Sequence, residues 1–218
     1  MDLLDRLLGH DWWTTRQLLL RCQELDEAAL RRAMDAGWGS AHATLAHMVG
    51  NVRTWTDLMN GNPAGDGVDE ERLGIDDLLA RHDAACADFA ATARRLQAEG
   101  RLDERWLDAL DDPPTEKSYG GTIAHVVTHN MHHRAELLHI LARLGLEDLP
   151  EGDALSWETD AGAPAVPEGS MTGAPNPLPH WQLPGRRFPS GSRRASTTRS
   201  PAGELGLPPV LFPLPAAA

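Results

Sequence analysis

The segment Gly121–Leu144, GTIAHVVTHNMHHRAELLHILARL, decides the fold class, because its apolar residues recur every three or four positions. This period predicts one long amphipathic helix, and Gly145 directly after it is typical of a helix C-terminus. Five of the chain's ten histidines also lie in this segment. The apolar stripe consists of Ile123, Val126, Val127, Leu137, Leu138, Leu141 and Leu144.

Three further stretches show the same helical period, over Leu3–Glu24, Ala41–Asn60 and Ile75–Glu99. Ser40 is a plausible N-cap for the second of them. Turn-forming residues at 61–63 and at 111–114 separate the helical stretches, and no alternating strand pattern is evident. The sequence therefore predicts an all-α fold, a four-helix bundle.

The composition changes near residue 160, which divides the 218-residue chain into two parts. Residues 1–160 carry 15 basic and 30 acidic residues, whereas residues 161–218 carry 5 and 2 and are rich in Pro, Gly, Ser and Ala. We predict a helical domain over residues 1–158 and a disordered tail over residues 159–218. A frameshift read-through in GC-rich DNA is an alternative origin for this tail.

Composition also bears on partners and compartment. A hydrophobic content of 41% allows a substantial core, and a net charge of −12 argues against a nucleic-acid partner. No apolar run is long enough for a membrane span, and residues 1–8 lack the basic start of a secretory signal. Cys22 and Cys86 are expected to be free, buried thiols of a reducing compartment. These features favour the cytoplasm.

The histidine spacing suggests a metal site. His129 and His133 are four residues apart, which places two imidazoles on one helix face within reach of one ion, and His125 extends the row by a turn. His47 in the second predicted helix is a candidate third ligand. With 100° per residue, His133, His129 and His47 lie roughly 80°, 120° and 140° from the centres of their apolar stripes. A site on the margin of the bundle, beside a cleft, is expected.

These residues also have simpler interpretations. A His-x3-His pair arises often by chance, and His47 taken alone is more typical of a surface or capped core histidine. Asp11 is expected to cap a helix or to pair with a basic residue. Tryptophans in the helical part either wall a ligand pocket or anchor the core. They are Trp12, Trp13, Trp38, Trp55 and Trp106.

Several segments resemble the DinB/YfiT-like family. The segment 121–137, GTIAHVVTHNMHHRAEL, is similar to the last helix of that family, and Trp157-Glu158 to its exit. The segment 40–50, SAHATLAHMVG, is similar to the second helix, and Gly9-His10-Asp11-Trp12 to the opening. The resemblance covers about residues 1–158 and none of the tail.

This resemblance implies a four-helix bundle with a metal bound by His47, His129 and His133. His132 matches a neighbouring histidine that is not usually a ligand. The family's HHRGQ string reads HHRAE at residues 132–136, so Glu136 replaces a glutamine. Glu136 is expected either to accept an imidazole N–H or to act as a general base on metal-bound water, and a solvated or ion-paired glutamate is the alternative.

The resemblance further implies a divalent transition metal such as Zn²⁺, Ni²⁺ or Fe²⁺ and a small-molecule substrate. Characterised relatives include thiol S-transferases and a thiol-dependent maleylpyruvate isomerase. We therefore expect a metal-dependent enzyme, either a transferase that uses a small thiol such as bacillithiol or mycothiol, or a hydrolase. The alternatives are a metal-binding stress-response module without turnover, and a purely structural bundle, either monomeric or homodimeric. No membrane or nucleic-acid partner is expected.

Overall fold

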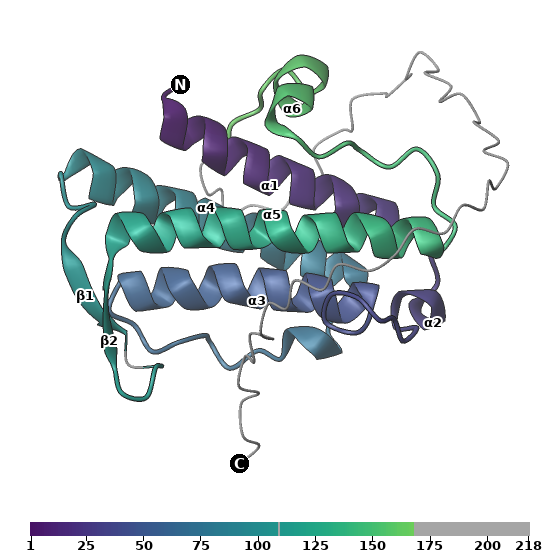
Figure 1. The fold of residues 1–218 in the computed structure, drawn as a ribbon, viewed down its shortest axis with the longest axis horizontal. Helices are drawn as coiled ribbons and strands as arrows, with labels where there is room; N and C mark the ends of the chain where they lie inside the picture. Colours follow the sequence, from purple (N-terminus) through teal and green to yellow (C-terminus); the bar gives the residue numbers. More distant parts are fainter. Residues whose placement is uncertain (109, 168–218) are drawn as a thin grey trace, which may run out of the picture. The chain divides into compact units, whose positions relative to one another are not determined.

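The computed structural model describes residues 1–108 and 110–167, and four long helices dominate this part of the chain (Figure 1). Each long helix packs against two others, so that α1, α4, α3 and α5 follow one another around the bundle. This confirms the predicted helical bundle, with ends within two residues of those expected. The long helices are α1 (Leu3–Cys22), α3 (Ala41–Met59), α4 (Ile75–Ala98) and α5 (Tyr119–Arg143).

Local signals explain where these helices begin and end. The Ser40 hydroxyl accepts the Ala43 N–H at 3.0 Å, which caps the first turn of α3 as expected. Gly145 follows α5 with a φ of 96°, in the left-handed region that glycine adopts without strain. The helix predicted to begin at Gly121 in fact begins two residues earlier, at Tyr119, because Ser118 supplies its N-cap.

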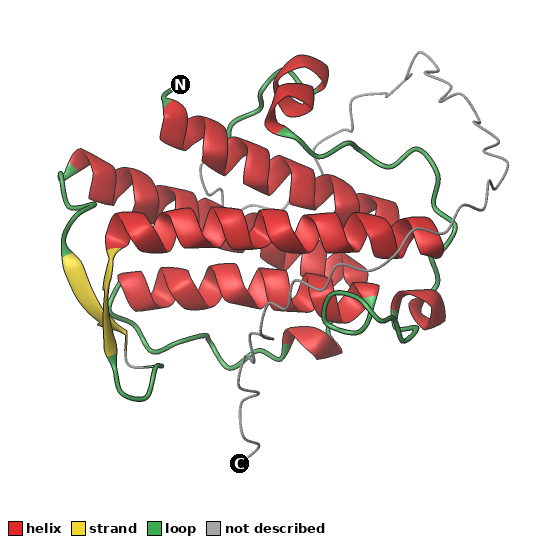
Figure 2. Cartoon of the chain, in the orientation of Figure 1, coloured by secondary structure: helices red, strands yellow, loops and turns green. Residues whose placement is uncertain are grey.

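A short β hairpin precedes α5, although the sequence pattern had indicated no strand. Strands β1 (Arg105–Asp108) and β2 (Thr115–Ser118) pair antiparallel, with Arg105 opposite Ser118 (Figure 2). Each strand has only four residues and lies mostly outside the core, so neither shows a hydrophobic alternation. The remaining short elements are α2 (Glu27–Leu30), the 3-10 turn η1 (Glu70–Arg72) and α6 (Ala154–Asp160).

The core consists of two groups of buried apolar side chains that fill the space between the four helices. Cys22 lies in one group and Cys86 in the other, and both thiols are free, as expected. Burial raises the pKa of Cys22 to about 12, so this thiol is protonated at neutral pH. Among the described residues, none of the helices has the length and apolar character needed to cross a membrane.

The described structure continues past the predicted domain boundary. The expected division between residues 158 and 159 falls inside α6, which packs on α1. Trp157 and Val166 are both buried. The first residues of the predicted tail are therefore packed against the bundle. The rest of that prediction, including its disorder, concerns residues 168–218, which lie outside the described structure.

Candidate metal centre

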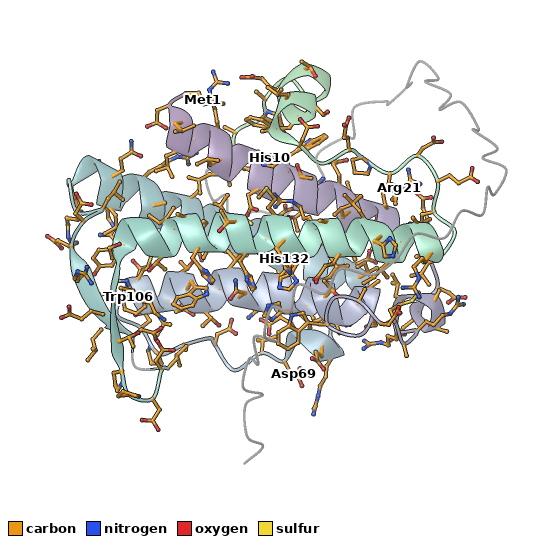
Figure 3. The ribbon with its side chains drawn as sticks, in the orientation of Figure 1. Met1, His10, Arg21, Asp69, Trp106 and His132 are labelled. Carbon is orange, nitrogen blue, oxygen red and sulfur yellow. The ribbon has the colours of Figure 1, made fainter. Side chains whose placement is uncertain are left out.

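The three histidines expected to act as ligands meet between α3 and α5. The Nε2 atom of His129 lies 2.9 Å from His47 Nε2 and 3.1 Å from His133 Nε2. His129 and His133 come from successive turns of α5, and His47 comes from α3, which packs beside it. Figure 3 labels their neighbour His132, midway along α5. We call His47, His129 and His133 the imidazole cluster.

The donor set of this cluster fits a divalent transition metal. Imidazole nitrogens bind such ions at about 2.0–2.1 Å, so two nitrogens on one ion are about 2.9–3.4 Å apart for angles between 90° and 109°. Both Nε2 distances from His129 fall in this interval. Within the described residues, no fourth Cys, His, Asp or Glu joins this group of three. Ligand positions for other molecules would therefore remain on the ion.

Glu136 determines which nitrogen of His133 carries a proton. Its Oε2 lies 2.7 Å from His133 Nδ1, and a carboxylate can only accept a hydrogen bond, so Nδ1 is the donor. The Nε2 atom of a neutral His133 is then unprotonated and directs its lone pair toward His129. This is the tautomer that a metal ligand needs. The other carboxylate oxygen, Oε1, lies 3.3 Å from His132 Nε2.

The surroundings keep two of the imidazoles neutral. Burial, followed by the charges that His133 and His129 would carry, lowers the pKa of His47 to about 4. Burial and the neighbouring imidazoles likewise lower the pKa of His129 to about 4, although Glu136 acts in the opposite direction. Each of these two rings therefore has one unprotonated nitrogen at neutral pH, as metal ligation requires.

A tryptophan and an asparagine border His47. The Trp38 ring stacks on His47, with centroids 3.9 Å apart and planes 20° apart. Asn51, one turn after His47, accepts the indole N–H of Trp55 through Oδ1 at 2.8 Å. Because an indole nitrogen only donates, this bond fixes the orientation of the amide. Its buried Nδ2 has no hydrogen-bond partner among the described residues.

Two hollows flank the imidazole cluster. The acidic hollow, of about 340 Å³, lies on the His47 side and is lined by Trp38, His47, Asn51, Asp69, Glu70 and Glu71, among others. The lysine hollow, of about 320 Å³, lies on the other side, where the His125 ring is 5.2 Å from that of His129. Its lining residues are Trp55, Lys117, Ser118, Gly121, Thr122 and His125. The cluster therefore lies at a margin beside open space, as expected from the helix geometry.

Asp11 pairs with a basic residue, which is one of its two expected roles. Its carboxylate accepts hydrogen bonds from Arg134 and, at 2.8 Å, from Asn130 Nδ2. All three side chains are buried between α1 and α5, and Arg134 also lies 3.2 Å from the Thr15 hydroxyl. We call Asp11, Asn130 and Arg134 the Asp11 cluster. It holds no candidate metal ligand except Asp11 and contributes to helix packing.

The other histidines are not part of the imidazole cluster. His10, His42 and His82 are buried, and each places Nε2 near a backbone carbonyl, as core histidines commonly do. His132 is 68% exposed in its side chain and belongs to a second group, with His133 and Glu136, that could also hold an ion. His125 lines the lysine hollow and does not join the three converging nitrogens.

Three residues near the imidazole cluster were not predicted as site residues from the sequence. They are Asn51, Lys117 and Trp38. Asn51 follows His47 by four residues, so helical spacing would have placed it on the same face. Lys117 was hidden because it belongs to the unexpected hairpin. Trp38 was only one of five tryptophans with two interpretations, and its stack on His47 depends on the loop before α3.

Comparison with known proteins agrees with this architecture. The sequence model of the DinB family matches residues 1–160, which include all three histidines of the imidazole cluster. No curated protein and no solved structure matches the chain significantly.

Proposed function

Because the chain belongs to the DinB family, we propose that it binds one divalent transition metal through His47, His129 and His133 and transfers a small thiol to an electrophile. The observation that carries the proposal is the convergence of three Nε2 atoms with no fourth protein ligand among the described residues. When bound there, Zn²⁺, Ni²⁺ or Fe²⁺ would act as a Lewis acid that lowers the pKa of a thiol.

The residues around the cluster have distinct supporting roles in this proposal. Glu136 accepts the Nδ1–H of His133 through one oxygen and contacts His132 through the other. Because both oxygens are engaged by imidazoles, we assign Glu136 the role of orienting His133 and not that of a general base. Trp38 covers one face of His47 and limits the access of water from that side. Asn51 lines the acidic hollow, and its buried Nδ2 has no hydrogen-bond partner among the described residues, so a small rotation of the amide would offer an N–H to the thiol compound.

The open sides of the cluster favour an enzyme over a structural metal site. Structural sites usually surround the metal with four protein ligands, whereas catalytic sites keep a position for substrate. Two hollows of similar volume adjoin the cluster, and a transfer between two molecules needs room for both. Hydrolysis, which needs room for one substrate and water, is the second reaction that this arrangement would support.

The test begins with the metal content of the untagged, full-length protein. We expect about one metal ion per chain after loading with Zn²⁺, Ni²⁺ or Fe²⁺, and none in a His129→Ala variant. His139→Ala is the matched control, because His139 is an exposed histidine of the same helix outside the cluster. Absence of metal in the wild-type protein after all three loadings would overturn the proposal.

The second stage measures turnover with a panel of small thiols and electrophiles. Metal-loaded protein should form thioether product faster than metal-free protein and faster than the His129→Ala variant. Equal rates would reject the transferase. Metal binding without turnover of thiols or of hydrolysable esters and amides would instead indicate a metal-binding module.

A further inference from the structure

The lysine hollow lies in line with the imidazole cluster along the groove between α3 and α5. On α3, His47, Asn51 and Trp55 are spaced by four residues and form one row. On α5, His129 and His125 form the facing row, and the ring of His125 lies 5.4 Å from that of Trp55. Eight residues of helix span about 12 Å, and His125, which lines the hollow, has its ring 5.2 Å from that of His129 in the cluster.

Trp55 is held as a flat wall of this hollow. Its N–H is occupied by Asn51, and the edge of Trp106 packs against it with centroids 6.2 Å apart. The Lys117 ammonium lies 5.1 Å from the centre of the indole ring. Trp55 therefore contributes apolar ring atoms to the lining of the hollow, because its only polar atom is engaged by Asn51. An ordered aromatic wall favours a flat, conjugated ligand.

The polar groups at the Lys117 end of the hollow, which lies beside the Trp55 ring, are mainly hydrogen-bond donors. Lys117 and Ser118 both line the hollow, and the Ser118 hydroxyl, which accepts the Gly121 N–H at 3.1 Å, keeps its own hydrogen to donate. The ammonium has three N–H groups, of which Asp108 and Asp111 occupy two. The Thr122 hydroxyl, by contrast, already donates to the Ser118 carbonyl at 2.9 Å. This end is suited to a carbonyl oxygen.

The charge balance disfavours an anionic ligand. Asp108 and Asp111 place two carboxylates against the single ammonium of Lys117, and no other lining residue of the hollow has a permanent charge. A carboxylate in the hollow would gain one hydrogen bond but would be repelled by the two aspartates. A neutral carbonyl group gains the same bond without this repulsion.

From these features we propose that the lysine hollow binds a small, flat, uncharged carbonyl compound, with its oxygen toward Lys117 and Ser118 and its conjugated body against Trp55. The assignment of this ligand as the electrophile rests on the function proposed above. For an α,β-unsaturated carbonyl compound, the thiol sulfur forms a bond to the β-carbon as the C=C π bond breaks. The thiol proton ends on the α-carbon, so the addition needs no further reactant.

The first test compares three probes with the metal-free, full-length protein by calorimetric titration. Cinnamamide is flat and neutral, cinnamate has the same skeleton with a negative charge, and 3-phenylpropanamide is neutral but not conjugated. We expect cinnamamide to bind at least tenfold more tightly than either of the others. Tighter binding of cinnamate would overturn the neutral class, and absence of cinnamamide binding would overturn the site.

Variants then locate the bound probe. Trp55→Leu should weaken cinnamamide binding at least tenfold, whereas Trp38→Leu, the matched change in the acidic hollow, should leave it unchanged. His125→Leu, at an exposed position, should weaken it severalfold and serves if Trp55→Leu does not fold. Equal losses in Trp38→Leu and Trp55→Leu would reject the location.

A His47→Ala variant separates this inference from the proposed function. It should lose the metal and still bind cinnamamide, because His47 does not line the lysine hollow. Metal binding without cinnamamide binding would leave the metal centre standing and reject the ligand assignment. Loss of cinnamamide binding in His47→Ala would show that the probe occupies the imidazole cluster, which also rejects the assignment.

Discussion

Helix α5 carries two polar clusters that are built on the same plan and differ in what completes them. The Asp11 cluster uses Asn130 and Arg134, four residues apart, with one residue from α1. The imidazole cluster uses His129 and His133, also four residues apart, with one residue from α3. The two pairs are offset by one residue, which turns one toward α1 and the other toward α3.

The difference lies in the charges of the partners. In the Asp11 cluster a carboxylate meets a guanidinium, so a protein group neutralises the buried charge. In the imidazole cluster three groups of the same kind meet, and the Glu136 carboxylate contacts the outer nitrogen of His133. A polar cluster whose opposite charges pair within the chain therefore serves packing, whereas three imidazoles with no counter-charge between them are suited to an external cation.

Removal of the carboxylate from the Asp11 cluster should have the largest effect on stability. In Asp11→Ala the buried Arg134 loses its counter-charge, and such losses cost about 3–5 kcal/mol of unfolding free energy. Urea unfolding of the metal-free protein measures this change. Asp35→Ala removes an exposed pair with Arg143 and should leave stability unchanged. Equal stabilities of the two variants would contradict the role of the buried Asp11–Arg134 pair in helix packing.

Removal of one imidazole should affect metal affinity more than stability. In His129→Ala the metal would lose one of three ligands, and we expect its Kd to rise at least 100-fold, or about 2.7 kcal/mol. The unfolding free energy of the metal-free protein should stay close to the wild-type value, because the cluster holds no internal ion pair. Competition with a chromophoric chelator gives the first quantity and urea unfolding the second. A large loss of stability with little change in Kd would make this cluster structural.

Acid should weaken the metal-free fold through the imidazole cluster. The pKa values of His47 and His129 are about 4 in the folded protein, below the usual value of 6.5, so the unfolded chain binds protons first as the pH falls. Stability is therefore complete above pH 6.5 and is lost between pH 6.5 and 4. Because both rings are partly exposed, we expect a loss of about 2 kcal/mol, well below the full linkage value.

The control for this pH dependence is a His47→Ala, His129→Ala double variant. It should lose less stability than the wild-type protein over the same interval in urea unfolding. Some dependence should remain, because burial also lowers the pKa values of His10 and His82. Identical pH profiles for wild type and double variant would show that these two imidazoles do not titrate as described.

The smallest effect is expected for the carboxylate beside the imidazole cluster. Glu136→Ala removes the acceptor that fixes the tautomer of His133, and a loss of this kind weakens metal binding about tenfold. Glu136→Gln should be milder, because its amide oxygen still accepts the Nδ1–H. Metal titrations of both variants provide the measurement. An effect of Glu136→Ala as large as that of His129→Ala would indicate a direct role in metal binding.

Periodicity accounts for much of what the sequence could predict. The bundle and the facing of His129 and His133 follow from local spacing, which a helix converts directly into geometry. The pairing of His47 with α5 is long-range: its helix position, roughly 140° from the apolar stripe, did not by itself favour a ligand, and its assignment as the third ligand came from the family resemblance. The structure brings it to 2.9 Å from His129.

Features set by loops and short strands were beyond this reasoning. The hairpin that brings Lys117 to Trp55 has strands of four mostly exposed residues, which leave no pattern to recognise. The position of Trp38 depends on a loop in which Gly37 and Gly39 have positive φ values. Asp11 was expected to pair with a basic residue, but local spacing could not select Arg134, 123 residues later in the chain.

The stack of Trp38 on His47 also provides an optical signal. The indole is 52% exposed, and its ring centre is 3.9 Å from that of the imidazole. A paramagnetic ion such as Ni²⁺ held by His47 would quench the fluorescence of this indole, and the difference between wild type and Trp38→Phe would isolate its contribution from the other six tryptophans. Occupancy of the imidazole cluster would thus be readable in real time, without a label, during rapid mixing with the metal.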